Sequence, residues 1–269
     1  MKLLALSGRR QSGKGSLVGF LVRNSRLFFG KHVYTNVLGS PTLTRIDEVS
    51  VHVLPFAVPI KEFTINYLGV PREWAYGDNQ AKENLTDIFW ESLPHYERLC
   101  EQTRERVIGE LAEETPPYEL KFIQLYDAIV PRGRMTVRQL LEEVGEAMFL
   151  SMNPRVWTDF FKREVQRLPD NAVVLNDDLR KPEQVDCVRE LGGKVIRLPR
   201  CPYPGDTSRA ETALDQDVYD WGKFNYVLRN ARQTLRQSEE DLYDILLTWG
   251  YINKLTSAQK STIVWANEE

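Results

Sequence analysis

Cysteine is scarce in this sequence, and long apolar runs are missing. The three cysteines (Cys100, Cys187 and Cys201) lie far apart and form no Cys-x-x-Cys pair, which argues against a disulfide framework and a zinc site. The three histidines have no metal-like spacing either. No stretch of about 18 apolar residues occurs, so we expect no transmembrane helix and no membrane partner. The apolar run Leu3–Leu6 is too short for a signal-peptide core. These absences favour a reducing, intracellular setting.

An excess of positive charge is also missing. The chain has 269 residues, with 35 Lys and Arg against 38 Asp and Glu, and a net charge of −3. Proteins that bind polymeric nucleic acid through bulk charge usually have a basic excess, so we expect no such partner. The balance still allows arginines to gather around one small anionic ligand. With 42% hydrophobic and 27% charged residues, the composition is that of a folded globular protein.

Apolar residues alternate between strand and helix periodicity along most of the chain. Strands are expected at 2–6, 49–54, 172–175, 194–198 and 226–228. Helices are expected at 14–26, 56–68, 96–112, 136–150, 156–168, 182–191 and 239–249. Strands separated by helices indicate an α/β fold with a mainly parallel central sheet of about five strands.

The same pattern favours one domain over the whole chain, residues 1–269. Residues 71–131 are rich in charge, Tyr and Trp. We interpret them as a helical insertion, not as a second full domain. Residues 232–269 are expected to form a C-terminal helical extension.

The strongest functional motif follows the first predicted strand and reads Gly-Arg-Arg-Gln-Ser-Gly-Lys-Gly-Ser over residues 8–16. It matches Gly-x-x-x-x-Gly-Lys, the phosphate-binding (Walker A) loop, except that the hydroxyl residue comes one position later. Glycines let backbone N–H groups wrap around a phosphate, and the next helix adds its positive end. The residues expected to bind the nucleotide are Gly8, Gln11, Ser12, Gly13, Lys14, Gly15 and Ser16.

Two further features fit phosphate chemistry. Asp177 and Asp178 end a predicted strand, where ligands of α/β proteins bind and where a carboxylate can hold Mg²⁺. A surface acidic turn, or an N-cap for the next helix, is the alternative for this pair. Arginine side chains suit phosphate groups, and arginines stand near the ends of predicted elements at positions 132, 134, 138, 155, 180, 200 and 209. For each of these arginines a solvated face is the alternative.

Five segments, in this order, resemble the deoxynucleoside monophosphate kinases of bacteriophages, a branch of the P-loop nucleoside monophosphate kinases. They are Gly8–Ser16, Pro55–Lys61, Thr136–Leu141 with Gly145, Asn153-Pro154 and Trp157, Val173–Arg180 with Pro182-Glu183 and Leu191–Arg197, and Glu211–Asp215 with Phe224–Val227 and Asn230. The resemblance spans residues 2 to about 230, and only the first segment is specific by itself.

The resemblance implies a P-loop kinase fold, a three-layer α/β sandwich, and ATP-dependent, Mg²⁺-assisted phosphorylation of a deoxynucleoside 5'-monophosphate (dNMP) to the diphosphate. It assigns catalysis to Lys14, Arg138, Arg180 and Asp178, metal binding to Ser16 and Asp178, and substrate binding to Phe56, Lys61, Arg134, Arg138 and Trp157. The insertion at 71–131 would then cover the acceptor. The implied partners are small nucleotides, with a homodimer left open. The implied location is the cytoplasm, which is that of the host cell if the protein is encoded by a phage.

Two other functions stay open. A P-loop kinase for another small acceptor, such as a sugar acid or a coenzyme precursor, would share Lys14 and Asp178 but not Arg138 as a phosphate grip. A nucleotide-binding module without phosphotransfer would fit two departures from the family motifs. Glu142 stands where the family has Gln, and Ser208-Arg-Ala-Glu211 stands where it has His-x-Ser-Glu. A P-loop ATPase or GTPase switch is a third possibility. The Gly15-Ser16 order and the absence of an Asn-Lys-x-Asp guanine signature argue against a GTPase.

Overall fold

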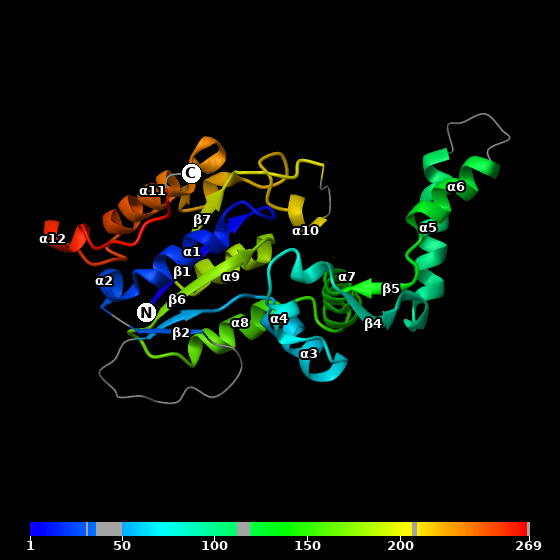
Figure 1. The fold of residues 1–269 in the computed structure, drawn as a ribbon, viewed down its shortest axis with the longest axis horizontal. Coiled ribbons are helices and arrows are strands. Elements are labelled where there is room, and N and C mark those ends of the chain that lie inside the picture. Colours follow the sequence, from blue (N-terminus) through cyan, green and yellow to red (C-terminus); the bar gives the residue numbers. More distant parts are fainter. Residues whose placement is uncertain (31, 36–49, 112–118, 206–208, 268–269) are drawn as a thin grey trace. The chain divides into compact units, whose positions relative to one another are not determined.

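The computed structural model describes residues 1–30, 32–35, 50–111, 119–205 and 209–267, and Figure 1 shows its elements. The chain divides into two compact units. The first unit comprises Met1–Pro59 and Asn153–Glu269, and the second comprises Ile60–Met152. The expected insertion at 71–131 therefore lies inside the second unit, which begins earlier and ends later. The single-domain organisation stays a prediction.

The first unit is built on a parallel sheet with the strand order β2-β3-β6-β1-β7-β8. The strands are β1 (Lys2–Gly8), β2 (His32–Thr35), β3 (Ser50–Val53), β6 (Val173–Leu179), β7 (Lys194–Leu198) and β8 (Tyr226–Val227). In the centre of the sheet, Leu4 of β1 pairs with Leu175 of β6 on one side and with Lys194 of β7 on the other. The α/β class and the parallel central sheet are thus confirmed, and β2 is a strand that the sequence analysis did not predict.

Helices cover both faces of this sheet, as a three-layer arrangement requires. They are α1 (Lys14–Arg23), α2 (Ser25–Phe29), α8 (Val156–Gln166), α9 (Pro182–Glu190) and α11 (Leu235–Thr248). Leu4 of β1 packs in one cluster with residues of α1, α2 and α11. Its neighbour Leu3 points to the opposite face, where Leu3 and Val188 of α9 both lie next to Gly193. Cys187 Sγ of α9 donates to Thr158 O of α8 at 3.7 Å, which joins the two helices of that face.

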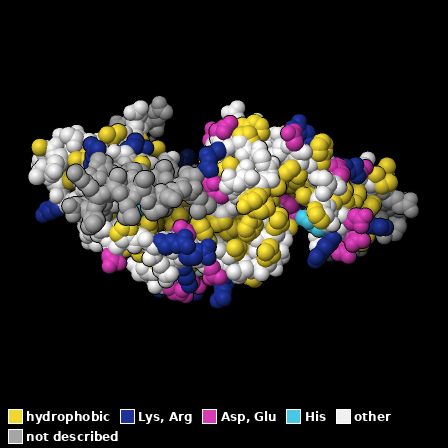
Figure 2. Space-filling model, turned by 90° about the horizontal axis from the view of Figure 1, so that it is seen from below, with side chains coloured by type: hydrophobic (Ala, Val, Ile, Leu, Met, Phe, Trp, Pro, Cys, Tyr) yellow, Lys and Arg dark blue, Asp and Glu magenta, His cyan; other side chains and the backbone are white. Residues whose placement is uncertain are grey.

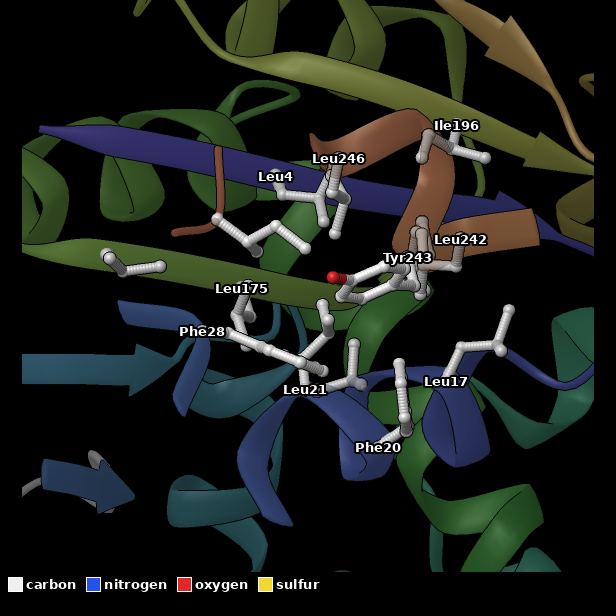
Figure 3. Close-up of a cluster of buried hydrophobic side chains, with 14 of the residues drawn as sticks. Leu4, Leu17, Phe20, Leu21, Phe28, Leu175, Ile196, Leu242, Tyr243 and Leu246 are labelled. Atoms are coloured by element: carbon white, nitrogen blue, oxygen red, sulfur yellow. The ribbon is translucent and has the colours of Figure 1, made fainter. Parts of the chain in front are cut away.

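The core between the sheet and α1, α2 and α11 is drawn in Figure 3. Its labelled members come from strands and helices that are far apart in the sequence: Leu4, Leu17, Phe20, Leu21, Phe28, Leu175, Ile196, Leu242, Tyr243 and Leu246. Each has at most 5% of its surface exposed. Burying side chains of this size stabilises a fold by about 1.5–3 kcal/mol each. This core therefore holds the amino end of α1 in place against the sheet.

The C-terminal extension packs back onto the first unit through Trp265. The indole ring stacks on Phe20 at 5.1 Å between centroids, and the Arg236 guanidinium lies 4.3 Å from its ring centroid. Val264 N donates to Asn24 Oδ1 at 2.8 Å. The remaining elements of this unit are α10 (Arg209–Thr212), η4 (Trp221–Lys223), η5 (Asn230–Arg232) and α12 (Ser257–Lys260).

The second unit is mainly helical. Its helices are α3 (Val58–Leu68, which starts in the first unit), α4 (Arg72–Ala75), η1 (Ala81–Glu83), η2 (Trp90–Ser92), α5 (Tyr96–Leu111), α6 (Glu119–Ile129), α7 (Val137–Glu143) and the π-helix η3 (Val144–Leu150). The expected helix at 136–150 thus changes its hydrogen-bond pattern halfway. An antiparallel pair, β4 (Leu85–Phe89) and β5 (Arg134–Thr136), was not predicted.

One face of the molecule carries charges of both signs (Figure 2). On the face drawn in Figure 2, basic side chains lie among acidic and hydrophobic ones. Within the described ranges, no helix has the length and the apolar content that a bilayer crossing requires.

Candidate functional site

The loop of residues 8–16 connects the buried strand β1 to helix α1, as the sequence predicts. Gly13, the residue before α1, has φ +100°, and Gln11 has φ +56°. Position 8 leaves no room for a side chain, because a Cβ there would lie 2.3 Å from Ser12 Oγ and 3.0 Å from Leu198 O. The loop is therefore folded tightly on itself at the carboxyl end of the central strand. In α/β sheets this end is where ligands bind.

Lys14 is the first residue of α1, and only 6% of it is exposed. Its Nζ donates to Gly8 O at 2.7 Å and to Arg9 O at 2.8 Å, so the amino group lies inside the curve of the loop. Burial, followed by the nearby Arg180 guanidinium, lowers the pKa of Lys14 to about 7. Nearby carboxylates oppose this shift without cancelling it. An anion placed beside Nζ would restore the charged form.

Asp177 and Asp178 end β6 but face different surroundings. A Cβ built on Gly15 would lie 3.7 Å from Asp177 Oδ2, so this carboxylate borders the loop. Asp178 accepts from Phe56 N at 2.8 Å and from Ala57 N at 2.9 Å, and Asn176 Nδ2 also donates to it at 2.9 Å. Both oxygens of Asp178 thus bind backbone N–H groups in front of α3. The metal role expected for Asp178 stays a prediction, and the geometry favours Asp177 as the carboxylate nearer to the loop.

Asn230 ties the loop to the far edge of the sheet. Its Nδ2 donates to Ser12 O at 2.8 Å, and its Oδ1 accepts from Arg200 N at 3.2 Å. Arg200 also borders a cavity of about 620 Å³, whose lining includes Arg232, Gln233 and Asn267. Its lining combines two arginines and polar side chains with the apolar Leu235 and Ala266, and Asn230 connects it to the loop.

Arg180, expected from the sequence, lies at this site and pairs with Glu211 of α10. The other oxygen of Glu211 accepts from the backbone N–H of Arg10 in the loop at 2.5 Å. The Glu211 side chain is only 5% exposed. Ser208, which belongs to the same motif, lies outside the described residues.

An ion network beside the loop was missed by the sequence analysis. Asp215 binds the guanidinium of Arg9 through both of its oxygens, and Arg197 Nη2 also donates to it at 3.2 Å. Arg197 Nη1 donates to Ser7 Oγ at 3.1 Å. Arg197 is only 3% exposed, and burial lowers its pKa. The available signal was an arginine inside an otherwise apolar strand, which calls for a buried partner.

Phe56 and Trp157, expected near a substrate base, both pack in the interior of the first unit. Phe56 is 1% exposed and stacks on Phe161 with 4.3 Å between ring centroids. Trp157 is 7% exposed. Core packing accounts for both positions, and neither ring offers a face to a ligand in this structure. Their substrate role stays a prediction.

The other expected substrate residues lie in the second unit. Arg138, in α7, donates to Glu83 Oε1 at 2.8 Å and to Asn79 Oδ1 at 3.0 Å. Arg134 donates to Thr86 O at 2.7 Å and to Asp87 Oδ1 at 2.6 Å, which braces the β4–β5 pair. Lys61 Nζ lies 4.6 Å from the centroid of the Tyr76 ring. Each of these cations thus has a partner within its own unit, and their substrate roles stay predictions.

The described part of the chain holds no group of three or more His, Cys, Asp or Glu side chains arranged for a metal ion. An Mg²⁺ ion bound to substrate phosphates takes only one or two carboxylates from the protein. Comparison with protein-family models and with curated proteins found no match for this chain.

Proposed function

We propose that this chain is a P-loop kinase that transfers the terminal phosphoryl group of ATP to a deoxynucleoside 5'-monophosphate. The observation that carries the proposal is the buried amino group of Lys14, held inside a glycine-rich loop between β1 and α1. Phosphoryl transfer needs positioning and charge neutralisation more than covalent chemistry. A loop of backbone N–H groups, a buried cation and the positive end of a helix supply both.

Lys14 has a specific task in this proposal. In the structure Nζ donates to the carbonyl oxygens of Gly8 and Arg9. When ATP binds, Nζ exchanges these carbonyls for phosphate oxygens, and the negative charge raises the pKa of Lys14. Arg180, whose side chain contributes to the lowered pKa of Lys14, neutralises charge on the transferring group.

Ser16 and Asp177 fit an Mg²⁺ ion. Ser16 is solvent-exposed in the first turn of α1, and the Asp177 carboxylate borders Gly15. A hydroxyl and a carboxylate are the oxygen ligands that Mg²⁺ takes beside substrate phosphates. The ion would supply electrostatic stabilisation of the phosphate oxygens. Asp178 has a different role here, because its oxygens hold the backbone N–H groups of Phe56 and Ala57.

The nucleoside part of ATP is assigned to the cavity lined by Arg200, Arg232 and Gln233. This cavity is joined to the loop through Asn230, which contacts both Ser12 and Arg200. A guanidinium can stack on a base, and amide groups can bind its edge.

The acceptor residues are taken from the resemblance to the deoxynucleoside monophosphate kinases. Arg138 grips the acceptor phosphate after exchanging its bonds to Glu83 and Asn79, and Lys61 assists. No proton-abstracting residue is required, because the acceptor phosphate is already an anion that can attack the terminal phosphorus of ATP. The P–O bond to ADP breaks as the new one forms, so that ADP and a deoxynucleoside diphosphate leave.

The test is a coupled assay of ADP release with Mg²⁺, ATP and each of the four dNMPs. We expect turnover with at least one dNMP, and loss of that turnover in Lys14→Met. The control variant is Lys260→Met, which removes a lysine from the exposed helix α12. The proposal fails if no dNMP is phosphorylated while another small acceptor stimulates ATP hydrolysis. It also fails if ATP binds but is never hydrolysed with any acceptor.

A further inference from the structure

The carboxylate of Glu211 occupies a position between the phosphate-binding loop and Arg180. One of its oxygens accepts from the backbone N–H of Arg10, and the other pairs with the Arg180 guanidinium. Only 5% of the Glu211 side chain is exposed. The carboxylate is therefore largely removed from water. Its hydrogen-bond donors in these contacts are the Arg10 backbone N–H and the Arg180 guanidinium.

These two donors come from separate elements that converge on one point. Arg10 belongs to the loop after β1, and Arg180 follows directly on β6. The strands β1 and β6 are neighbours in the parallel sheet, so their carboxyl ends bring the two donors together. A backbone N–H and a guanidinium, converging beside the buried Lys14, form a donor set for oxyanions.

We propose that Arg10 N–H and Arg180 form a subsite for a phosphate oxyanion, and that Glu211 fills this subsite until a phosphate displaces it. The proposal rests on the proposed function for the identity of the ligand, which is the terminal phosphoryl group of a nucleoside triphosphate. In this scheme the Glu211 carboxylate competes with phosphate for the subsite. It keeps the loop N–H and Arg180 paired with an anion before the nucleotide arrives.

Asp215, four residues further along the chain, has a different role. Its partners are the Arg9 and Arg197 guanidinium groups, and Arg197 is 3% exposed. Removing the Asp215 charge would leave a buried cation without its anion. Asp215 is therefore unsuitable as a control. Asp217 is suitable, because it is exposed and its neutralisation changes the net charge by the same amount.

The experiment measures the binding of inorganic tripolyphosphate, which has the phosphates of a nucleotide but no base or sugar. Calorimetric titration compares the wild type with Glu211→Gln and Asp217→Asn. We expect Glu211→Gln to bind tripolyphosphate about tenfold more tightly, because a neutral amide competes less well for Arg180. Asp217→Asn should stay within about twofold of the wild type, since only a screened surface charge is lost. Unchanged or weaker binding by Glu211→Gln would overturn the proposal.

A second measurement uses the wild type and so does not depend on the folding of a variant. The carboxyl carbon of Glu211, labelled with ¹³C, should change its NMR shift when tripolyphosphate is added, together with the Arg10 amide. A change at Arg10 without one at Glu211 would show that the carboxylate stays in place, and would overturn the proposal.

The two proposals fail in different ways. If Glu211→Gln binds tripolyphosphate more tightly but no dNMP is phosphorylated, the subsite stands and the kinase assignment fails. If dNMPs are phosphorylated but Glu211→Gln binds tripolyphosphate no more tightly than the wild type, the kinase assignment stands and the subsite fails.

Discussion

The side-chain amide of Asn230 donates a 2.8 Å hydrogen bond to the carbonyl oxygen of Ser12. The same side chain accepts from Arg200 N at 3.2 Å. Asn230 is 3% exposed, so its side chain makes these bonds largely away from water. One buried amide thus connects the phosphate-binding loop with the chain segment that follows β7.

We expect Asn230→Ala to lower the free energy of unfolding by about 2–3 kcal/mol, because it leaves the Ser12 carbonyl and the Arg200 N–H unsatisfied in the interior. ATP affinity should fall as well, since Ser12 belongs to the loop. Urea denaturation measures the stability. The matched control is Asn253→Ala, because Asn253 is exposed and its side chain donates to Leu27 O at a long 3.5 Å. This control should stay within about 0.5 kcal/mol of the wild type.

The pKa of Lys14 makes nucleotide binding depend on pH. In the structure this pKa is lowered to about 7 by burial. A bound phosphate favours the charged amine and raises the pKa, so binding takes up a proton at pH values between the free and the bound pKa. The affinity for Mg·ATP should therefore fall as the pH rises from about 7 to 9, by up to about tenfold per pH unit.

Calorimetry in buffers of different ionisation enthalpy measures this proton uptake directly. Lys14→Met should bind Mg·ATP weakly and without uptake of this proton. Proton uptake of the same size in Lys14→Met would assign the effect to another group. An affinity of the wild type that does not change between pH 7 and 9 would contradict the prediction.

Substitutions of Asp177 and Asp178 should affect different properties of the protein. Asp178→Asn weakens the acceptor for the N–H groups of Phe56 and Ala57, and we expect it to reduce the free energy of unfolding by about 1.5–3 kcal/mol. Asp177→Asn should change the stability little but raise the Mg²⁺ concentration that half-saturates dNMP phosphorylation. A titration with Mg²⁺ and a urea melt on both variants test this. If instead Asp178→Asn changed the Mg²⁺ requirement and Asp177→Asn changed the stability, Asp178 would be the metal ligand.

Strand periodicity accounts for part of this distinction, although the pairing of β6 with β1 is irregular beside Asp177 and Asp178. Successive residues of a strand point to opposite faces of the sheet. Leu175 packs on the face of α1, so Asp177 lies on that same face, beside Gly15. Asp178 points the other way, toward residues 56 and 57. The apolar run before the two aspartates predicted the strand, but only the position of α1 decides which face holds the loop.

Local patterns were predictable, and pairings between distant segments were not. Strand β7 was predicted at 194–198 and is observed as Lys194–Leu198, because its apolar run is bounded by glycines and a proline. The pair β4 and β5 joins segments that are far apart in the chain, and β5 has only three residues. Its register depends on tertiary contacts such as Thr86 Oγ1 to Met135 O. The partner of Arg197 is equally non-local, since Asp215 is reached only by the folded chain.

Substitution of Arg138 tests binding of the phosphate acceptor, the dNMP, separately from binding of ATP. If Arg138 grips the acceptor phosphate, Arg138→Ala should raise the KM for the dNMP by about 10–100-fold, the loss of one charge-assisted contact. The KM for ATP should change by less than about threefold, since Lys14 and the loop are untouched. Arg132→Ala is the control, because Arg132 is an exposed arginine paired with the exposed Asp127. Equal losses for both substrates, accompanied by a lower melting temperature, would instead show that Arg138 serves the second unit through Glu83 and Asn79.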